Sequence, residues 1–491
     1  MNTAAAGERE LKTFNYISYG LGDLYGGGSF FIISTFSMYF LVTVVGLNPA
    51  LAGLIPGLGK VWDSISDPLM GYITDNTKSK YGRRRLFFLI GVLPIIITFT
   101  LIWVPFDAGG QFAKFLYYFF AYLFFYTCST MVLVPYSALS AEMTLDFGKR
   151  NRLTGTRMIF SMIATLTAGV VAQPLIDAFG DQRTGHLVMG LFFGLFFALP
   201  YLLVFWGTWE LPVAKKPPQK DLNIFKNFSS IFQNRSFQFH ILMYICAYAG
   251  MDVLMAWLKF YLIDYLQRPG FVTIGLGTIL ITQIVALPIY VKIANKKGHG
   301  TAYRIGLSIW AVAIALMGFQ APGSSTVLLV LNCFFIGAGM SAGVLIPFQL
   351  LPFVADVDEL ITSEHRAGTY AGAMTLMRKL IQGALVLPLM GLLLEIIGYQ
   401  AHAADVVVKQ GPQTLMWLRI LFIGSPLLMA VAGAVISTKF PITPENHAVL
   451  RREIDRLRTG GRKEDVDPQT KQVCEHLSGL KYEELYTTQK I

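Results

Sequence analysis

Long apolar segments alternate with short polar connections along most of the chain. Twelve segments reach the roughly 20 mainly apolar residues that a helix needs to cross a bilayer. They span residues 13–43, 50–75, 85–106, 112–142, 152–177, 187–209, 237–265, 270–294, 302–321, 326–354, 367–397 and 412–438. Because backbone polar groups in lipid must be hydrogen-bonded within the protein, only helices or a closed barrel can cross a membrane. The helical periodicity of these long runs excludes the barrel and predicts an all-α membrane protein with twelve transmembrane helices.

A polar stretch divides the predicted helices six and six. Residues 210–236 contain three prolines and several lysines, which predicts a cytoplasmic linker between an N-terminal six-helix half (1–209) and a C-terminal six-helix half (237–440). A short echo supports duplication, because the stretch 72–91 resembles the stretch 290–306 directly after the second helix of each half. Two such halves are expected to form a solute site where they meet.

The composition and the placement of charge favour a membrane protein over a nucleic-acid-binding one. Of the 491 residues, 54% are hydrophobic and 14% are charged, against roughly 25% charged in soluble domains. The net charge is +10, and the basic clusters occupy alternate connections, near residues 78–85, 149–152, 215–235 and 296–304. Cationic loops resist translocation. We therefore predict that these loops and both termini lie in the cytoplasm, and that the protein resides in a plasma membrane, the inner membrane of a bacterium.

The tail differs in character from the rest of the chain. Residues 441–491 are polar and contain a charged stretch at 445–458, which predicts one surface helix. We interpret the tail as a solvated cytoplasmic segment, in preference to a regulatory domain.

Two acids in the second predicted helix are the strongest site candidates. Asp63 and Asp67 are four residues apart and share one face of a helix. Two carboxylates in a low-dielectric site repel each other, so one is protonated unless a cation neutralises the pair. Ser66, on nearly the same face, adds a hydroxyl, and hard cations prefer oxygen ligands. This pattern predicts a Na⁺ or H⁺ site; the alternative is a structural pair of acids held by Lys or Arg.

Other charges fall inside predicted spanning segments, where they are costly and are functional candidates. Lys379 lies about 12 residues into its segment, and either pairs with the acids or holds a hydroxyl or carboxylate of the solute. Arg157 either lines an inner cavity or anchors the helix at the membrane interface. Asp23, among glycines of the first helix, is either functional or structural. Asp252 and Lys259, seven apart on one helix face, are expected to pair with each other.

Several runs together resemble a known family. The motif Asp63-x-x-x-Asp67-Pro68-x-x-Gly71, followed by the run 75–83, is similar to the glycoside–pentoside–hexuronide:cation symporters, the melibiose-permease branch of the major facilitator superfamily. Collinear matches extend the resemblance over nearly the whole chain up to residue 440. They are Tyr19-Gly20-Leu21-Gly22-Asp23, Val134-Pro135-Tyr136-Ser137-Ala138-Leu139, Arg150, Arg157, Ala355-Asp356-Val357-Asp358-Glu359 and Lys379.

The resemblance implies the major facilitator fold and a secondary active transporter that works by alternating access, driven by Na⁺, Li⁺ or H⁺. By the same resemblance, Asp63 and Asp67 are the cation-site carboxylates, which would be Na⁺ ligands in a sodium-coupled carrier. The resemblance also implies that Thr130 provides a further hydroxyl of the cation site and that Lys379 is the family lysine beside that site. Arg157 would be the family arginine of the fifth helix.

The chain also departs from the family pattern. Gly27 and Leu133 align with two sugar-binding aspartates of the melibiose permease, and Ser137 aligns with its aromatic platform. Carboxylates accept hydrogen bonds from neutral sugar hydroxyls, so their loss argues against galactosides. A solute site with Ser137, Asp23, Lys379 and Arg157 would suit a sugar acid such as a uronide or oligouronide.

Charged residues near the predicted cytoplasmic helix ends are candidates for a gate, with solvated loop residues as the alternative. They are Asp75 with Arg83, Arg84 and Arg85, and the acidic run Asp356, Asp358 and Glu359 facing Arg366.

Other classes of membrane protein compete with the symporter. Lysophospholipid transporters of the same branch share the helix-two acids and the lysine, but the long external loops expected of them are missing from this chain. An uncoupled facilitator would differ only in coupling. A membrane enzyme is not expected, because no zinc, Walker or nucleophile-elbow motif lies on a suitable element. We expect a monomer in a lipid bilayer whose partners are a small solute and a coupling cation, with no other cofactor and no nucleic acid.

Overall fold

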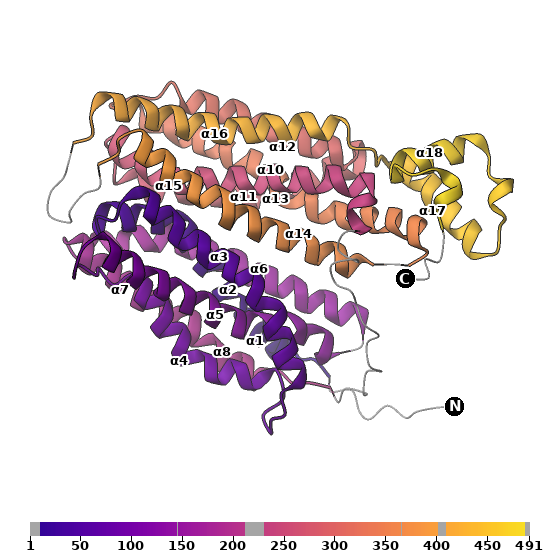
Figure 1. Ribbon diagram of the computed structural model, residues 1–491, viewed down its shortest axis with the longest axis horizontal. Coiled ribbons are helices and arrows are strands. Elements are labelled where there is room, and N and C mark those ends of the chain that lie inside the picture. The colour runs from indigo at the N-terminus through magenta and orange to yellow at the C-terminus, as the bar shows by residue number, and fades with distance from the viewer. Residues whose placement is uncertain (1–9, 145, 212–229, 365, 401–408, 487–491) are drawn as a thin grey trace. The chain divides into compact units, whose positions relative to one another are not determined.

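The computed structural model describes residues 10–144, 146–211, 230–364, 366–400 and 409–486, and within these ranges it is helical and contains no strand. Helices α1 to α8 come from the first half of the chain and α10 to α16 from the second (Figure 1). The first set is α1 (Thr13–Leu21), α2 (Asp23–Tyr39), η1 (Phe40–Val44), α3 (Pro49–Asn76), α4 (Arg85–Ile102), α5 (Gln111–Met143), α6 (Phe147–Asp177), α7 (Gln182–Ala198) and α8 (Pro200–Gly207). The second set is α10 (Arg235–Phe260), η3 (Tyr261–Tyr265), α11 (Phe271–Lys297), α12 (His299–Met317), α13 (Thr326–Thr362), α14 (Ala367–Ile381), η4 (Gln382–Val386), α15 (Leu387–Ile396) and α16 (Pro412–Thr438).

The predicted set of membrane helices is confirmed. Among the described residues, eleven helical spans are long and apolar enough to cross a membrane. The twelfth is α3, which has 28 residues, about 42 Å at the usual helical rise. It carries Lys60, Asp63 and Asp67, which lower its hydropathy. Asn48 caps α3, since its side chain accepts hydrogen bonds from the backbone N–H groups of Ala50 and Leu51.

The chain forms two compact units. The first unit comprises Met1–Pro217, Met255–Leu280 and Gln382–Leu418, and the second comprises Pro218–Leu254, Ile281–Ile381 and Arg419–Ile491. Parts of α10, α11 and the span from α14 to α15 therefore belong to the first unit although they lie in the second half of the sequence. The boundaries predicted at residues 209 and 237 stay a prediction.

The first spanning helix of each half ends in the same way. Both η1 and η3 are short π-helices that continue a long α-helix. In the first half, the N–H of Val45 bonds to Phe40 O and that of Leu47 to Leu41 O; in the second, Leu266 bonds to Tyr261 O and Arg268 to Leu262 O. The intervening residue is left-handed in each case, Gly46 with φ 70° and Gln267 with φ 56°. This repeated backbone geometry supports the predicted duplication.

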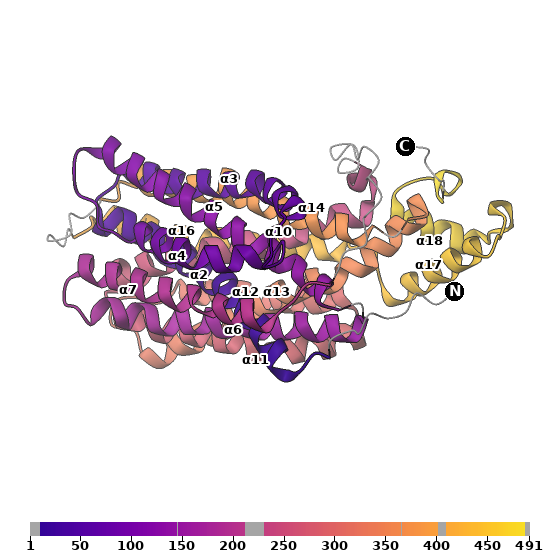
Figure 2. The same cartoon turned by 90° about the horizontal axis from the view of Figure 1, so that it is seen from below.

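Two predicted boundaries differ from the structure. The helix expected to end at residue 354 continues as α13 to Thr362, so the acidic run 356–359 is helical. The tail contains two helices, α17 (Pro444–Arg458) and α18 (Pro468–Ser478), in place of one (Figure 2). Leu450, Ile454 and Leu477 are fully buried, so this part of the tail is packed and is not simply a solvated segment.

Candidate functional site

Four side chains that were predicted to bind a cation through oxygen atoms meet between α3 and α5 in the first unit. They are Asp63, Ser66, Asp67 and Thr130. The Thr130 hydroxyl oxygen lies 3.1 Å from Asp63 Oδ1 and 3.1 Å from Asp67 Oδ1. It also lies 3.0 Å from the Ser66 hydroxyl, which is 3.2 Å from the Asp63 carbonyl oxygen. Asp63, Ser66 and Thr130 are 2%, 6% and 3% exposed. The Thr130 hydroxyl thus bridges the two predicted carboxylates, and Ser66 joins this largely buried cluster through Thr130 and a backbone carbonyl.

The Thr130 hydroxyl cannot donate a hydrogen bond to both carboxylates at once. A threonine hydroxyl carries one hydrogen, yet the oxygen is equally close to two carboxylate oxygens. It can donate to only one of them at a time. The other close approach of two oxygens is favourable if a proton or a metal cation lies there.

Lys60 gives the alternative interpretation of Asp63 some support. Its ammonium lies 3.6 Å from Asp63 Oδ2 and over the rings of Phe30, at 4.3 Å, and Tyr126, at 5.1 Å. Lysine is thus one partner of Asp63, as the structural alternative requires. The contacts between Thr130 and both carboxylates lie outside this ion pair.

Asp23 and Arg157 form a second polar cluster of the first unit. Arg157 Nε lies 3.1 Å from Asp23 Oδ1, and the guanidinium lies 5.1 Å from the centre of the Tyr136 ring. The Tyr136 hydroxyl donates to Tyr19 O at 2.6 Å. Ser137 follows in α5, and its hydroxyl donates to Val134 O at 2.8 Å. The structure therefore brings together two of the predicted solute-site residues, while Ser137 bonds to its own helix.

Lys379 lies in α14, within the second unit, where it is half-buried. Its predicted link to Asp63 and Asp67 stays a prediction. Arg378 was not among the predicted site residues, although two adjacent basic residues in an apolar segment are a signal that could have identified it. The expected pair of Asp252 and Lys259 is wrong, because Asp252 pairs with Arg378 at 3.8 Å and Lys259 lies 4.5 Å above the rings of Phe36 and Tyr39.

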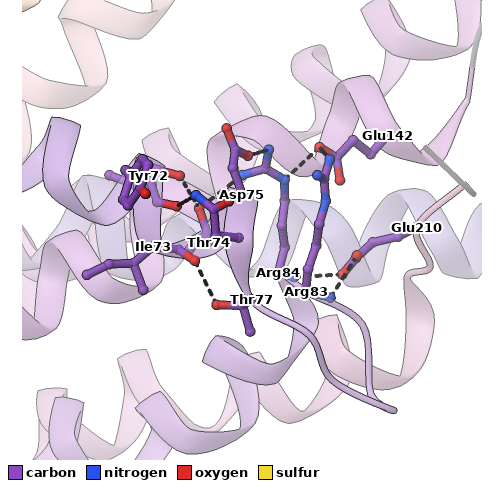
Figure 3. Close-up of polar contacts among 12 residues, drawn as sticks. Tyr72, Ile73, Thr74, Asp75, Thr77, Arg83, Arg84, Glu142 and Glu210 are labelled. Carbon is purple, nitrogen blue, oxygen red and sulfur yellow. Dashed lines mark hydrogen bonds and ion pairs between the residues drawn. The ribbon is translucent and has the colours of Figure 1, made fainter. Parts of the chain in front are cut away.

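The first group of gate candidates forms a charge network at the connection between α3 and α4 (Figure 3). Arg84 pairs with Asp75 at 2.8 Å and with Glu142 at 2.7 Å, and Arg83 pairs with Glu142 at 2.5 Å. Glu210 accepts hydrogen bonds from the backbone N–H groups that begin α4, at 2.9 to 3.0 Å, as an acid does at a helix N-terminus. These arginines are therefore not solvated loop residues.

The second group of gate candidates also has specific partners. Asp358 binds Arg366 through two hydrogen bonds, at 2.6 and 2.8 Å, and this carboxylate raises the pKa of the Arg366 guanidinium. Asp356 binds His447 at 2.8 Å and Arg451 at 3.2 Å, both in α17. Glu359 pairs with Arg458 at the end of the same helix. The acidic run thus attaches the tail to α13.

The donor set of the Asp63 cluster consists of oxygens alone, which suits a hard cation. Across the part of the chain that the structure describes, no group of three or more His, Cys, Asp or Glu side chains is arranged to hold a metal ion.

In the part of the chain that the structure describes, eleven apolar spans and the charged helix α3 define a multi-pass membrane protein. Solved structures support this fold: a mutant of the nucleoside transporter NupG superposes with a TM-score of 0.61 at 15% identity, over 86% of this chain and 98% of NupG. The sequence matches, over residues 18–444, the family described as MFS/sugar transport protein. The chain belongs to this family.

Two relatives span nearly the same length. One, from Escherichia coli strain K12, is named "Putative sulfoquinovose importer" and is 25% identical, over 91% of this chain and 94% of the relative. The other, from Danio rerio, is named "Sodium-dependent lysophosphatidylcholine symporter 1-A" and is 23% identical, over 93% of this chain and 91% of the relative. The chain is thus similar both to a protein named for a sugar and to one named for a lysolipid.

Proposed function

We propose that the protein is a cation-coupled symporter of a sugar, a glycoside or a sugar acid, working by alternating access in a plasma membrane with both termini in the cytoplasm. The observation that carries this proposal is the position of Thr130, whose single hydroxyl is 3.1 Å from both Asp63 and Asp67. A Na⁺ ion or a proton between these oxygens would remove the repulsion of the two carboxylates.

The coupling follows from this arrangement. Without the cation, two ionised acids one turn apart push α3 and its neighbours away from the packed geometry. With the cation, the cluster closes and the neighbouring solute site is prearranged. By thermodynamic linkage, the solute then raises the affinity for the cation by the same factor.

The solute side favours a sugar acid within the sugar class. Gly27 and Leu133 offer no carboxylates to neutral hydroxyls, while Arg157 presents a guanidinium that is 30% exposed beside Asp23. Arginine binds carboxylates and sulfonates through paired N–H donors. The relative named as an importer of sulfoquinovose, a sulfonated sugar, is consistent with this preference.

The test is uptake by proteoliposomes that contain the purified protein. Labelled neutral glycosides and uronides would be offered under imposed Na⁺ and H⁺ gradients, separately. We expect accumulation against a solute gradient with one of the two cations, and its loss in Asp67→Asn. Equilibration without accumulation in the unaltered protein would identify a facilitator and contradict the proposed coupling.

A second candidate function rests on the relative named as a lysophosphatidylcholine symporter. The same vesicles would be offered a labelled lysophospholipid. Cation-dependent lysophospholipid uptake, together with no uptake of any sugar or sugar acid, would replace the proposed function by this one.

A further inference from the structure

A ladder of polar and aromatic side chains runs along one face of α10 in the second unit. Tyr244, Tyr248 and Asp252 follow each other at intervals of four residues, which places them on the same side of the helix. The two tyrosine rings are 4.7 Å apart, and Phe348 of α13 packs nearly perpendicular to both, at 5.9 and 6.3 Å. Phe348 is nevertheless 47% exposed, so this aromatic group borders an open surface.

Arg378 of α14 lies on this ladder. Its guanidinium carbon is 4.1 Å from the centre of the Tyr248 ring, and its Nη2 is 3.8 Å from Asp252 Oδ1. The guanidinium also interacts with the Tyr244 hydroxyl. Stacking on Tyr248 fixes the plane of the guanidinium, which limits its freedom before any ligand arrives.

The pairing of Arg378 with Asp252 is loose. A separation of 3.8 Å exceeds the length of a hydrogen bond, whereas the bidentate pair of Arg366 with Asp358 is 2.6 and 2.8 Å long. The Arg378 side chain also remains 36% exposed. An arginine has five N–H donors, and among the described residues the polar partners of Arg378 are the Tyr244 hydroxyl and the more distant Asp252 carboxylate.

The energetic cost of placing charges in this segment indicates that Arg378 has a function. Arg378 and Lys379 place two adjacent positive charges inside one spanning segment, where each charge is costly. A structural ion pair would be expected to close to hydrogen-bonding distance. A planar cation held on an aromatic ring, with more N–H donors than close acceptors and an exposed aromatic neighbour, is instead suited to a carboxylate or sulfonate on a ligand with an apolar ring face.

We propose that this cluster of the second unit recognises the acid group of the solute, and that Arg378 binds the carboxylate or sulfonate of an acidic sugar. Asp252 accepts hydrogen bonds from sugar hydroxyls, and Phe348 contacts the apolar face of the ring. The inference rests on the proposed function and assigns the recognition of the acid group to named residues of the second unit.

The decisive comparison uses two solutes that differ only in the acid group, methyl β-D-glucuronide and methyl β-D-glucoside. In proteoliposomes, Arg378→Gln is expected to raise the KM for the glucuronide about 10- to 100-fold, the range for one lost charged contact. The KM for the glucoside should change less than about threefold. Arg378→Lys keeps the charge but loses the paired donors, so its KM for the glucuronide should lie between those of Arg378→Gln and the unaltered protein.

Asp252→Asn separates solute binding from a structural ion pair. If Arg378 serves the solute, Asp252→Asn raises the KM for both solutes, which share the hydroxyls that Asp252 binds, whereas Arg378→Gln raises it for the glucuronide alone. If the two residues form a structural pair, Asp252→Asn and Arg378→Gln should reduce the uptake of both solutes equally, and the inference would be wrong. Thermal unfolding of each detergent-solubilised variant shows whether it is folded.

Solute uptake by the unaltered protein distinguishes failure of the role of Arg378 from failure of the proposed function. Cation-driven uptake of the glucoside without the glucuronide would overturn the role of Arg378 and leave the proposed function intact. Uptake of neither these solutes nor any other sugar or sugar acid would overturn both. Uptake of methyl β-D-glucuronide that is inhibited by a sulfonated hexose would support the inference for both acid groups.

Discussion

Replacement of Thr130 by valine is the sharpest test of the cation site. Valine matches the shape of threonine and removes only the hydroxyl that lies 3.1 Å from Asp63 Oδ1 and 3.1 Å from Asp67 Oδ1. Thr130 is 3% exposed, so water cannot easily replace the lost group. Thr130→Ser restores the hydroxyl and should restore most of the function.

The size of the effect follows from the loss of one contact to a charged group. A hydrogen bond to an ionised side chain contributes about 1.5 to 3 kcal/mol. Each 1.4 kcal/mol is a tenfold change in a binding constant. Thr130→Val should therefore raise the Na⁺ concentration for half-maximal uptake about 10- to 100-fold in a sodium-coupled carrier. In a proton-coupled carrier, the ionised acids lose a donor, and the pH profile of uptake should move to higher pH.

The assay is initial uptake as a function of Na⁺ concentration and of pH at a fixed solute concentration. Thr127→Val is the matched control. Thr127 also links α5 to α3, since it accepts a hydrogen bond from Trp62 Nε1 at 2.9 Å, but it is exposed and its own hydroxyl donates to Leu123 O. If Thr130→Val and Thr127→Val have the same cation dependence as the unaltered protein, the cluster is not the coupling site.

Three further predictions concern packing and the tail. A Cβ at Gly383 would lie 2.8 Å from the Gly57 carbonyl oxygen, so Gly383→Ala should lower uptake, the melting temperature and, by about 1 to 3 kcal/mol, the free energy of unfolding. Gly372→Ala is the control, because a Cβ there has no neighbour within 4 Å and should leave uptake and the melting temperature nearly unchanged. Burial raises the pKa of the Cys474 thiol to about 12 from an ordinary value of about 8.5. Between these two pH values the unfolded tail releases a proton that the folded tail keeps, so the stability of the tail should fall as pH rises. Maleimide labelling of Cys474 at pH 8 should therefore be slow until the tail is unfolded. Lys259 is fully buried and its ammonium has no hydrogen-bond partner among the described residues, so Lys259→Met should stabilise the detergent-solubilised protein by about 1 to 4 kcal/mol in thermal unfolding; a lower melting temperature would contradict this reasoning.

The helices could be predicted because the membrane makes their requirements simple. Length and hydrophobicity decide whether a segment spans, and a proline seldom ends a helix in lipid because its neighbours compensate. The two helix boundaries that differed from the prediction both lie outside the apolar region. Pro347 and Pro352 stand inside α13, and the run 356–359 continues the helix because its acids are bound by arginines that the helix ends bring close.

The cation cluster was partly predictable and the partners of the gate were not. Asp63, Asp67 and Ser66 follow from spacing on one helix, whereas Thr130 required the resemblance to a family. Glu142 and Glu210 bind the same arginine run from positions 58 or more residues away along the chain, and no spacing rule connects them. Asp252 and Lys259 were expected to pair, but seven residues correspond to about 10.5 Å along a helix, too far for direct contact.

One span links the cation cluster to the proposed acid-binding residue. Arg378 and Lys379 end α14 in the second unit, and the π-helix η4 begins three residues later at Gln382, where the chain passes into the first unit. There, a Cβ on Gly383 would lie 2.8 Å from Lys60 Cβ, and Lys60 is the residue that pairs with Asp63. Short π-helical turns inside long helices are often found at functional sites because they distort the regular hydrogen bonds. The backbone that packs against Lys60 at η4 therefore continues without interruption into the helix that carries Arg378.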